Sequence, residues 1–232
     1  MILFSSALAL GFLHGLGADH LMAIAALAVG PAGATAATPM RTRALGVAIR
    51  FAVGHALLLA IGAGAIVALG WSLPLVVERG GEILGGALLV AMGLAGVWGV
   101  LSGRVYGHSH QHRDEPTAHW HLHVGHPDRH PRATAHSHLP TIVGAAFAVS
   151  SLRALTLLAP AMGGDAFDVV TLPTLLALIA VFGVGILLSM SLFGVAFARL
   201  MSTAAIARVG RGAVLAMAAA SVSLGVFWIV SA

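Results

Sequence analysis

Apolar residues are gathered along this chain into six long blocks, which are separated by more polar connections. Each block can hold a helix of about 20 residues, the length needed to cross the hydrocarbon core of a bilayer. The pattern therefore predicts an all-α membrane protein with six transmembrane helices. The blocks cover roughly residues 2–29, 44–69, 80–102, 141–162, 172–198 and 206–231.

A weak internal repeat divides the six blocks into two groups of three. Three pairs of segments align in order, at offsets of 133, 131 and 130 residues. Because each copy holds an odd number of spans, the second copy must lie upside down in the bilayer relative to the first. We therefore predict a 3+3 inverted repeat, made of residues 1–102 and 141–232, about an axis in the membrane plane. The aligned pairs are Gly11–Gly30 with Gly144–Gly163, Arg50–Leu58 with Val181–Ser189, and Leu94–Trp98 with Leu224–Trp228.

Composition agrees with a membrane protein. Hydrophobic residues make up 59% of the chain and charged residues 9%, and the mean hydropathy is +0.97. A pI of about 11.3 would suggest a nucleic-acid partner in a soluble protein. Here the arginines lie mostly in the connections, so we expect the lipid bilayer as a partner and no nucleic acid. Cysteine is absent, which favours metals bound by nitrogen and oxygen, such as Ni²⁺, Co²⁺, Cu²⁺ or Zn²⁺, over Cu⁺.

The arginines also predict the orientation of the chain. Nine of them lie in the first, third and fifth connections, whereas the other two connections have only Arg79. Because positively charged loops remain in the cytoplasm, these three connections should face the cytoplasm and both termini should lie outside. We expect the protein in the cytoplasmic (inner) membrane, with the long connection of residues 103–140 on the cytoplasmic side.

The first block contains three ionisable side chains within seven residues, His14, Asp19 and His20. A charge at the centre of a spanning helix costs about 2.5 to 3.5 kcal/mol, so such residues usually face a bundle interior and mark a pathway. On an unbroken helix His14 would lie about 140° from Asp19 and about 120° from His20, so the three could not face one ion. Gly15 and Gly17 disfavour a regular helix, and we predict a kink there. The alternative is a polar cluster that only joins helices.

His55 lies in the middle of the second block. It follows Gly54, which would let another backbone approach closely. This histidine is either part of a site with the first motif or a core residue bonded to a backbone carbonyl. We favour the first, because nitrogen and oxygen ligands together suit Ni²⁺ or Co²⁺, and less distinctively Zn²⁺. The predicted metal site consists of His14, Asp19, His20 and His55.

The second half of the chain does not repeat this motif, so the site is expected in the first half only. The aligned pairs are His14 with Phe147, Asp19 with Leu152, and His20 with Arg153. An arginine in an apolar span is costly, and Arg153 is our candidate for a residue of the pathway or gate. It either pairs with Asp19 when no cation is bound or reaches the interface from the end of its helix.

Ten of the thirteen histidines lie in the long polar connection, mostly in His-x-His pairs with acidic residues among them. Such tracts chelate divalent metals with modest selectivity. A pH-responsive linker is the competing interpretation, but we favour accessory metal capture because the membrane motif independently calls for a metal. With few apolar residues, the connection is expected to be disordered without metal. The ten are His108, His110, His112, His119, His121, His123, His126, His130, His136 and His138.

The spacing His14-x4-Asp19-His20, followed by Gly54-His55 in the second block, resembles the nickel/cobalt transporter superfamily. The likeness is nearest to its short six-span branch, which includes the urease-accessory permease UreH. It covers the motif in the first sixty residues and the span count in both halves. The resemblance implies that the four ionisable residues of this motif handle the ion.

The chain also departs from that family. Leu13 stands where the family usually has arginine, and Gly17 stands where it has an additional aspartate. Related nickel/cobalt efflux proteins share the six-span plan and a His-rich loop, but carry Glu-Pro-Gly-His in place of Ala18-Asp19-His20. The membrane motif therefore favours uptake, whereas the loop favours efflux.

We therefore expect a secondary transporter that moves Ni²⁺, or Co²⁺, by alternating access. No Gly-x4-Gly-Lys-Ser/Thr motif is present, so the chain should not use ATP itself. We do not expect an enzyme, since nothing beyond the proposed ligands is placed to serve a metal-activated water. Open alternatives are an efflux protein fed by the loop, a metal-sensing or chaperone membrane protein, and an anion exporter. Transition-metal ions are the expected partners, with cytosolic metallochaperones as an open alternative.

Overall fold

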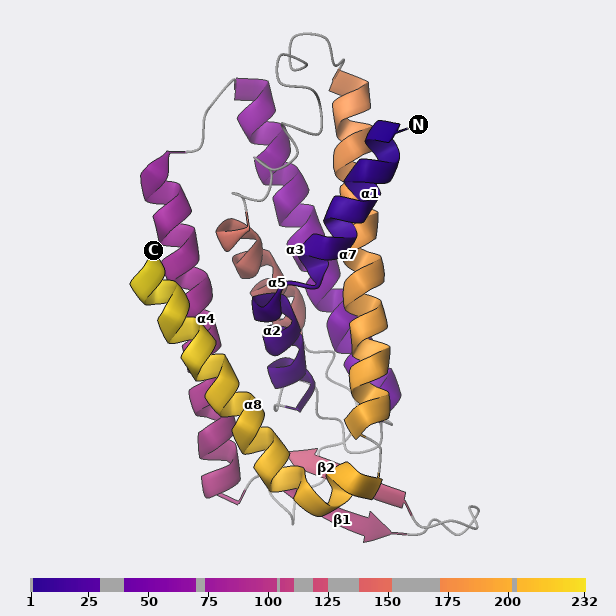
Figure 1. Cartoon of the computed structure of the whole chain (residues 1–232), viewed down its shortest axis with the longest axis vertical. Coiled ribbons are helices and arrows are strands. Elements are labelled where there is room, and N and C mark those ends of the chain that lie inside the picture. The colour runs from indigo at the N-terminus through magenta and orange to yellow at the C-terminus, as the bar shows by residue number, and fades with distance from the viewer. Residues whose placement is uncertain are drawn as a thin grey trace.

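The computed structural model describes residues 2–29, 40–69, 74–103, 105–110, 119–124, 138–151, 172–201 and 204–232. Within these residues the chain forms seven helices and a sheet of two strands (Figure 1). The elements are α1 (Ile2–Gly15), α2 (Ala18–Val29), α3 (Met40–Leu69), α4 (Leu75–Leu101), β1 (Val105–His110), β2 (His119–Val124), α5 (Leu139–Ser150), α7 (Leu172–Met201) and α8 (Ala204–Ser231).

Several of these helices could span a membrane. Helices α3, α4, α7 and α8 are each long and apolar enough, and α1 with α2 makes a fifth span if this bent pair counts as one. The predicted helices are confirmed, and their length and composition are consistent with a multi-pass membrane protein. The fourth predicted block, residues 141–162, is only partly described, because α5 ends at Ser150 and residues 152–171 lie outside the described part. Six spans therefore remain a prediction.

The direction of the chain alternates from one segment to the next. Followed by colour in Figure 1, α1 and α2 run toward the end that carries the strands, α3 runs back, and α4 returns to the strands. Helices α5, α7 and α8 then run away from, toward and away from that end. Both chain termini consequently lie toward the end of the bundle opposite the strands.

The helices pack in pairs, and each pair consists of one helix from the first half of the chain and one from the second. Helix α1 packs on α7, α5 packs on α3, and α4 packs on α8. Glycine makes the first two contacts close. A Cβ atom added at Gly11 would collide with the carbonyl group of Phe182, and one added at Gly144 would collide with that of Phe51. The offsets found in the sequence relate Gly11 to Gly144 and Phe51 to Phe182. The same glycine-to-carbonyl contact therefore occurs twice: once from the first half to the second, and once from the second half to the first.

A second pair of contacts follows the same rule. Gly54 of α3 lies against the carbonyl of Thr141, and Gly185 of α7 lies against the carbonyl of Leu8. The same offsets relate Gly54 to Gly185 and Leu8 to Thr141. Glycine is needed at both positions because a side chain would push one backbone away from the other.

Two segments of the polar connection form strands, which were not predicted. Strands β1 and β2 pair antiparallel, with His108 opposite His121 and His110 opposite His119. Their alternating His-x-His spacing fits the two-residue period of a strand. The pair of strands contacts α4 and α8. His112, His126, His130 and His136 lie outside the described residues, and His138 is exposed at the start of α5.

Candidate metal centre

The first predicted span is broken at the metal motif. Helix α1 ends at Gly15 and α2 begins at Ala18, and their axes differ by 55°. In the break, the Gly17 amide donates to the His14 carbonyl at 3.0 Å. The predicted kink is confirmed. It places His14 in the last turn of α1 and Asp19 in the first turn of α2.

The two glycines of the motif are required by close neighbours. A Cβ atom at Gly17 would lie 2.6 Å from Oδ1 of Asp19 and 2.8 Å from Nδ1 of His20. A Cβ atom at Gly15 would collide with the hydroxyl of Ser189 on α7. Side chains at these positions would therefore displace the ionisable groups or separate the helices.

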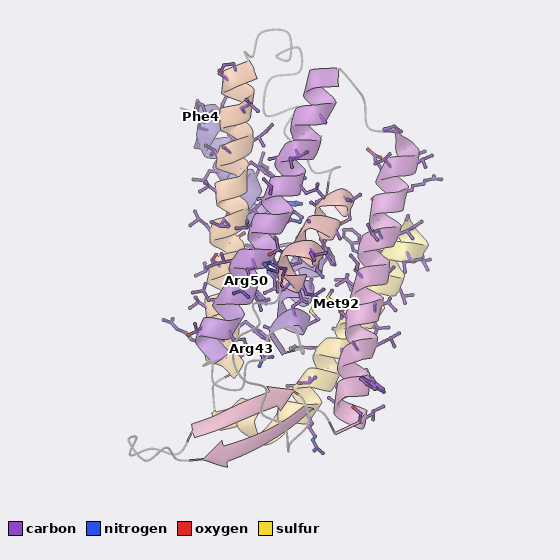
Figure 2. The ribbon with its side chains drawn as sticks, turned by 180° about the vertical axis from the view of Figure 1, so that it is seen from behind. Phe4, Arg43, Arg50 and Met92 are labelled. Atoms are coloured by element: carbon purple, nitrogen blue, oxygen red, sulfur yellow. The ribbon has the colours of Figure 1, made fainter. Side chains whose placement is uncertain are left out.

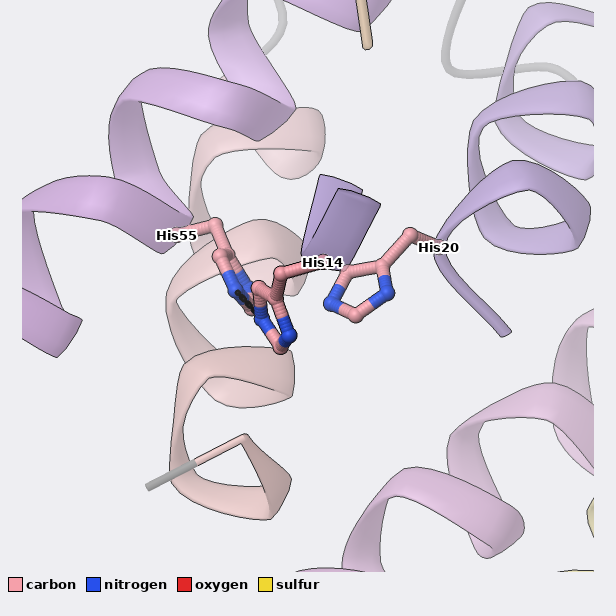
Figure 3. A group of neighbouring side chains, drawn as sticks. All are labelled: His14, His20 and His55. Carbon is pink, nitrogen blue, oxygen red and sulfur yellow. Dashed lines mark hydrogen bonds between the residues drawn. The ribbon is translucent and has the colours of Figure 1, made fainter. Parts of the chain in front are cut away.

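Three imidazoles converge beside this break (Figure 3). One ring nitrogen from each of His14, His20 and His55 lies within 4.8 Å of the other two. Nε2 of His14 is 3.3 Å from Nε2 of His55. The His20 and His55 side chains are almost completely buried, at 2% and 0% exposed, and His14 is partly buried. Side chains separated by 41 residues in sequence thus form one compact group of nitrogen donors.

Each of two rings in this group has its second nitrogen against an oxygen. Nδ1 of His55 lies 3.2 Å from the carbonyl oxygen of Gly144, which fixes its proton on Nδ1. Nδ1 of His20 lies 2.8 Å from Oδ1 of Asp19, although it forms no hydrogen bond with any residue that the structure describes. In His55, Nε2 is left with a lone pair that can bind a metal. An imidazole with one nitrogen against a carbonyl or carboxylate is the usual arrangement of a metal-ligating histidine.

Asp19 was predicted to be a ligand, and the structure places it beside His20 and outside the group of three imidazoles. Its Oδ1 contacts His20, whereas its Oδ2 is buried and has no hydrogen-bond partner among the residues that the structure describes. A buried carboxylate oxygen without a hydrogen-bond partner costs about 1–3 kcal/mol or more. A divalent cation in the imidazole group would offset that cost.

Aromatic side chains enclose the imidazoles. The Phe51 ring stacks on His55 with an interplanar angle of 8°, and the Phe182 ring lies 5.7 Å from that of His14. Phe147, the counterpart of His14 in the second half, is completely buried, and so is Ile186, the counterpart of His55. These two counterparts are therefore apolar and buried, whereas those of Asp19 and His20 lie outside the described residues.

The second half contributes two contacts to the site. Helix α5 supplies the Gly144 carbonyl, and Oγ of Ser151 lies 3.3 Å from Nε2 of His20. Neither contact could be predicted from neighbouring residues, because the first depends on how α5 packs on α3 and the second on how the end of α5 lies against α2.

The predictions made for the arginines can be tested only in part. Arg153 lies outside the described residues, so its pairing with Asp19 stays a prediction. Arg43 and Arg50 lie in the half of α3 nearer to the strands, whereas Phe4 lies toward the other end of the bundle (Figure 2). The positive charge of α3 therefore lies on the side that arginine counting assigned to the cytoplasm.

Comparison of the chain with protein-family models, with curated proteins and with solved structures finds no match. The likeness to nickel/cobalt transporters therefore depends on the motif residues alone.

Proposed function

We propose that this chain is a secondary transporter that carries Ni²⁺, with Co²⁺ as a second candidate, across the cytoplasmic membrane. Its relationship would be with the six-span branch of the nickel/cobalt transporters. The main support is the group formed by His14, His20 and His55 at the break of a bent apolar helix. Interrupted helices that expose backbone and side chains at mid-membrane are how many transporters build ion sites.

The donor set favours borderline transition metals. Imidazole nitrogen suits Ni²⁺, Co²⁺, Cu²⁺ and Zn²⁺, while hard ions such as Mg²⁺ and Ca²⁺ prefer oxygen. The chain has no cysteine, so thiolate sites for softer ions are absent. An anion would gain nothing from Asp19, which lies against His20. The site therefore supports a divalent transition-metal cargo better than an anion.

The architecture proposed for this transporter is six spans in a 3+3 inverted repeat. Alternating chain direction and the exchanged glycine contacts of α1 with α7 and of α5 with α3 support it. In such a transporter the two halves rock against each other around the site. Uptake is the favoured direction, because the membrane motif is that of the uptake branch.

Efflux is the second candidate, and one observation favours it. The strands that carry His108, His110, His119, His121 and His123 lie at the end of the bundle opposite both termini. If the termini are outside, these histidines face the cytoplasm, where they would capture metal for export. In an uptake protein the same histidines would receive imported metal or pass it to a metallochaperone.

Flux of radiolabelled nickel into sealed proteoliposomes of known orientation tests the proposal. We expect uptake or release of Ni²⁺ by the wild type and at least about tenfold slower flux in His55→Gln, which removes an imidazole from the buried group. Leu57→Ala is the control on the same helix, because the Leu57 side chain is 61% exposed and lies outside the imidazole group. Wild-type flux no faster than that of empty vesicles, or full flux in His55→Gln, would refute the proposal. Arg153→Leu should change affinity or turnover.

A further inference from the structure

The hydroxyl of Ser151 occupies an unusual position for a serine at the end of a helix. Ser150 and Ser151 are both buried, and both hydroxyls donate to the carbonyl of Phe147, at 2.7 and 3.2 Å. Only Ser151 also faces the imidazole group, with Oγ 3.3 Å from Nε2 of His20. The two neighbours therefore share burial and helix but differ in this one contact.

The Ser151 hydroxyl has one proton and two acceptors within reach, the Phe147 carbonyl at 3.2 Å and Nε2 of His20 at 3.3 Å. When that proton is directed at Phe147, a lone pair of Oγ faces Nε2 of His20. A cation placed between Oγ and Nε2 could then be bound by both atoms.

The distances match a four-coordinate ion. Ligand atoms about 2.1 Å from a tetrahedral ion lie about 3.4 Å from one another. Nε2 of His14 and Nε2 of His55 are 3.3 Å apart, and Nε2 of His20 and Oγ of Ser151 are also 3.3 Å apart. These two pairs have the length of opposite edges of such a tetrahedron. Because the ring nitrogens of the three histidines lie up to 4.8 Å apart, the longest of these distances would have to shorten by about 1.4 Å to close the tetrahedron.

We propose that the Ser151 hydroxyl is the fourth ligand of the transported ion, beside the three imidazoles. This inference rests on the proposed function, and it adds a ligand from the second half of the chain. The bound ion then ties α5 to α2 and α3, so that loading the site joins the two halves that must move in transport. A neutral hydroxyl is a weak ligand, which suits a site that must release its ion as well as bind it.

The chain has no cysteine, which makes Ser151→Cys a specific probe in the full-length protein. Titration of this variant with Co²⁺ should produce a thiolate-to-cobalt charge-transfer absorption at one ion per chain, because a thiolate in place of Oγ would bind the ion directly. Every protein compared in these titrations carries alanine at the ten histidines of the polar connection, which would otherwise bind cobalt as well. The wild type should show only the ligand-field bands of a cobalt ion bound by nitrogen and oxygen. Ser150→Cys is the matched control and should show no charge-transfer band.

Ser151→Ala supplies a second measurement should the cysteine variant fail to fold. Its Co²⁺ affinity should be about tenfold or more below that of Ser150→Ala, which loses the bond to Phe147 but no ligand. Cobalt bound to Ser151→Cys without a charge-transfer band would overturn the inference and leave the metal site intact, as would equal affinities of the two alanine variants. Ligand-field bands that are the same in the wild type and in His55→Gln would overturn the proposed function as well.

Discussion

A methyl group added at Gly54 should disturb both the packing of the two halves and the metal centre. A Cβ atom there would collide with the carbonyl oxygen of Thr141 and lie 2.9 Å from its carbonyl carbon and 3.1 Å from its Cα. Carbon atoms in contact are ordinarily about 3.5–4.0 Å apart. Helices α3 and α5 would therefore have to separate by about 1 Å, and overpacking of this kind costs about 1–3 kcal/mol.

Separating α3 from α5 would also weaken a contact of the next residue, His55. Its Nδ1 lies 3.2 Å from the Gly144 carbonyl on α5, and a shift of about 1 Å would take that contact beyond hydrogen-bond range. The ring would lose the bond that orients Nε2. We expect Gly54→Ala to bind Co²⁺ about tenfold more weakly, which corresponds to about 1.4 kcal/mol.

Thermal unfolding and cobalt titration of the purified protein in one detergent measure both effects. Gly64→Ala is the matched control on the same helix, because a Cβ atom there meets nothing within 4 Å. That control should be as stable as the wild type or more stable by up to about 1 kcal/mol, since alanine favours a helix over glycine. The reasoning would be refuted by a Gly54→Ala variant with wild-type Tm and affinity, or by a control that loses as much.

Three further predictions concern the site and the loop. Gly17→Ala should slow nickel flux at least about tenfold. The added carbon would lie 2.6 Å from Oδ1 of Asp19 and would push this carboxylate away from His20. Undiminished flux in proteoliposomes would contradict this prediction. Asp19→Asn keeps the size of the side chain but removes its charge, so cobalt affinity should fall about 10–100-fold, and an unchanged titration would leave Asp19 a packing role only. Deleting residues 107–138 should preserve flux at saturating Ni²⁺ and reduce it at low Ni²⁺, whereas loss at every concentration would place the function in the loop.

The features that could be predicted from sequence depend on neighbouring residues. The length of each apolar block sets the helices that could span a membrane, and glycines at positions 15 and 17 predicted the break of the first one. The break in turn allowed His14 and His20 to converge, which an unbroken helix forbids. His55 could be assigned to the same site because a buried histidine needs a polar partner.

The features that could not be predicted depend on contacts between distant segments. Ser151 and His20 are 131 residues apart, and Gly144 and His55 are 89 apart. The first contact exists because the end of α5 lies against α2, and the second because α5 packs on α3. No periodicity in the sequence encodes either choice. The strands were missed for another reason: composition predicted disorder, whereas the alternating histidines fit the two-residue period of a strand.

The central claim is that His14, His20 and His55 bind a divalent transition-metal ion inside the membrane. Replacing the ten histidines of the polar connection by alanine leaves these three as the only imidazoles in the chain. X-ray absorption of this variant loaded with one equivalent of Co²⁺ should show three imidazole nitrogens around the metal. A variant that binds no cobalt, or a spectrum with water oxygens alone around the ion, would contradict the claim.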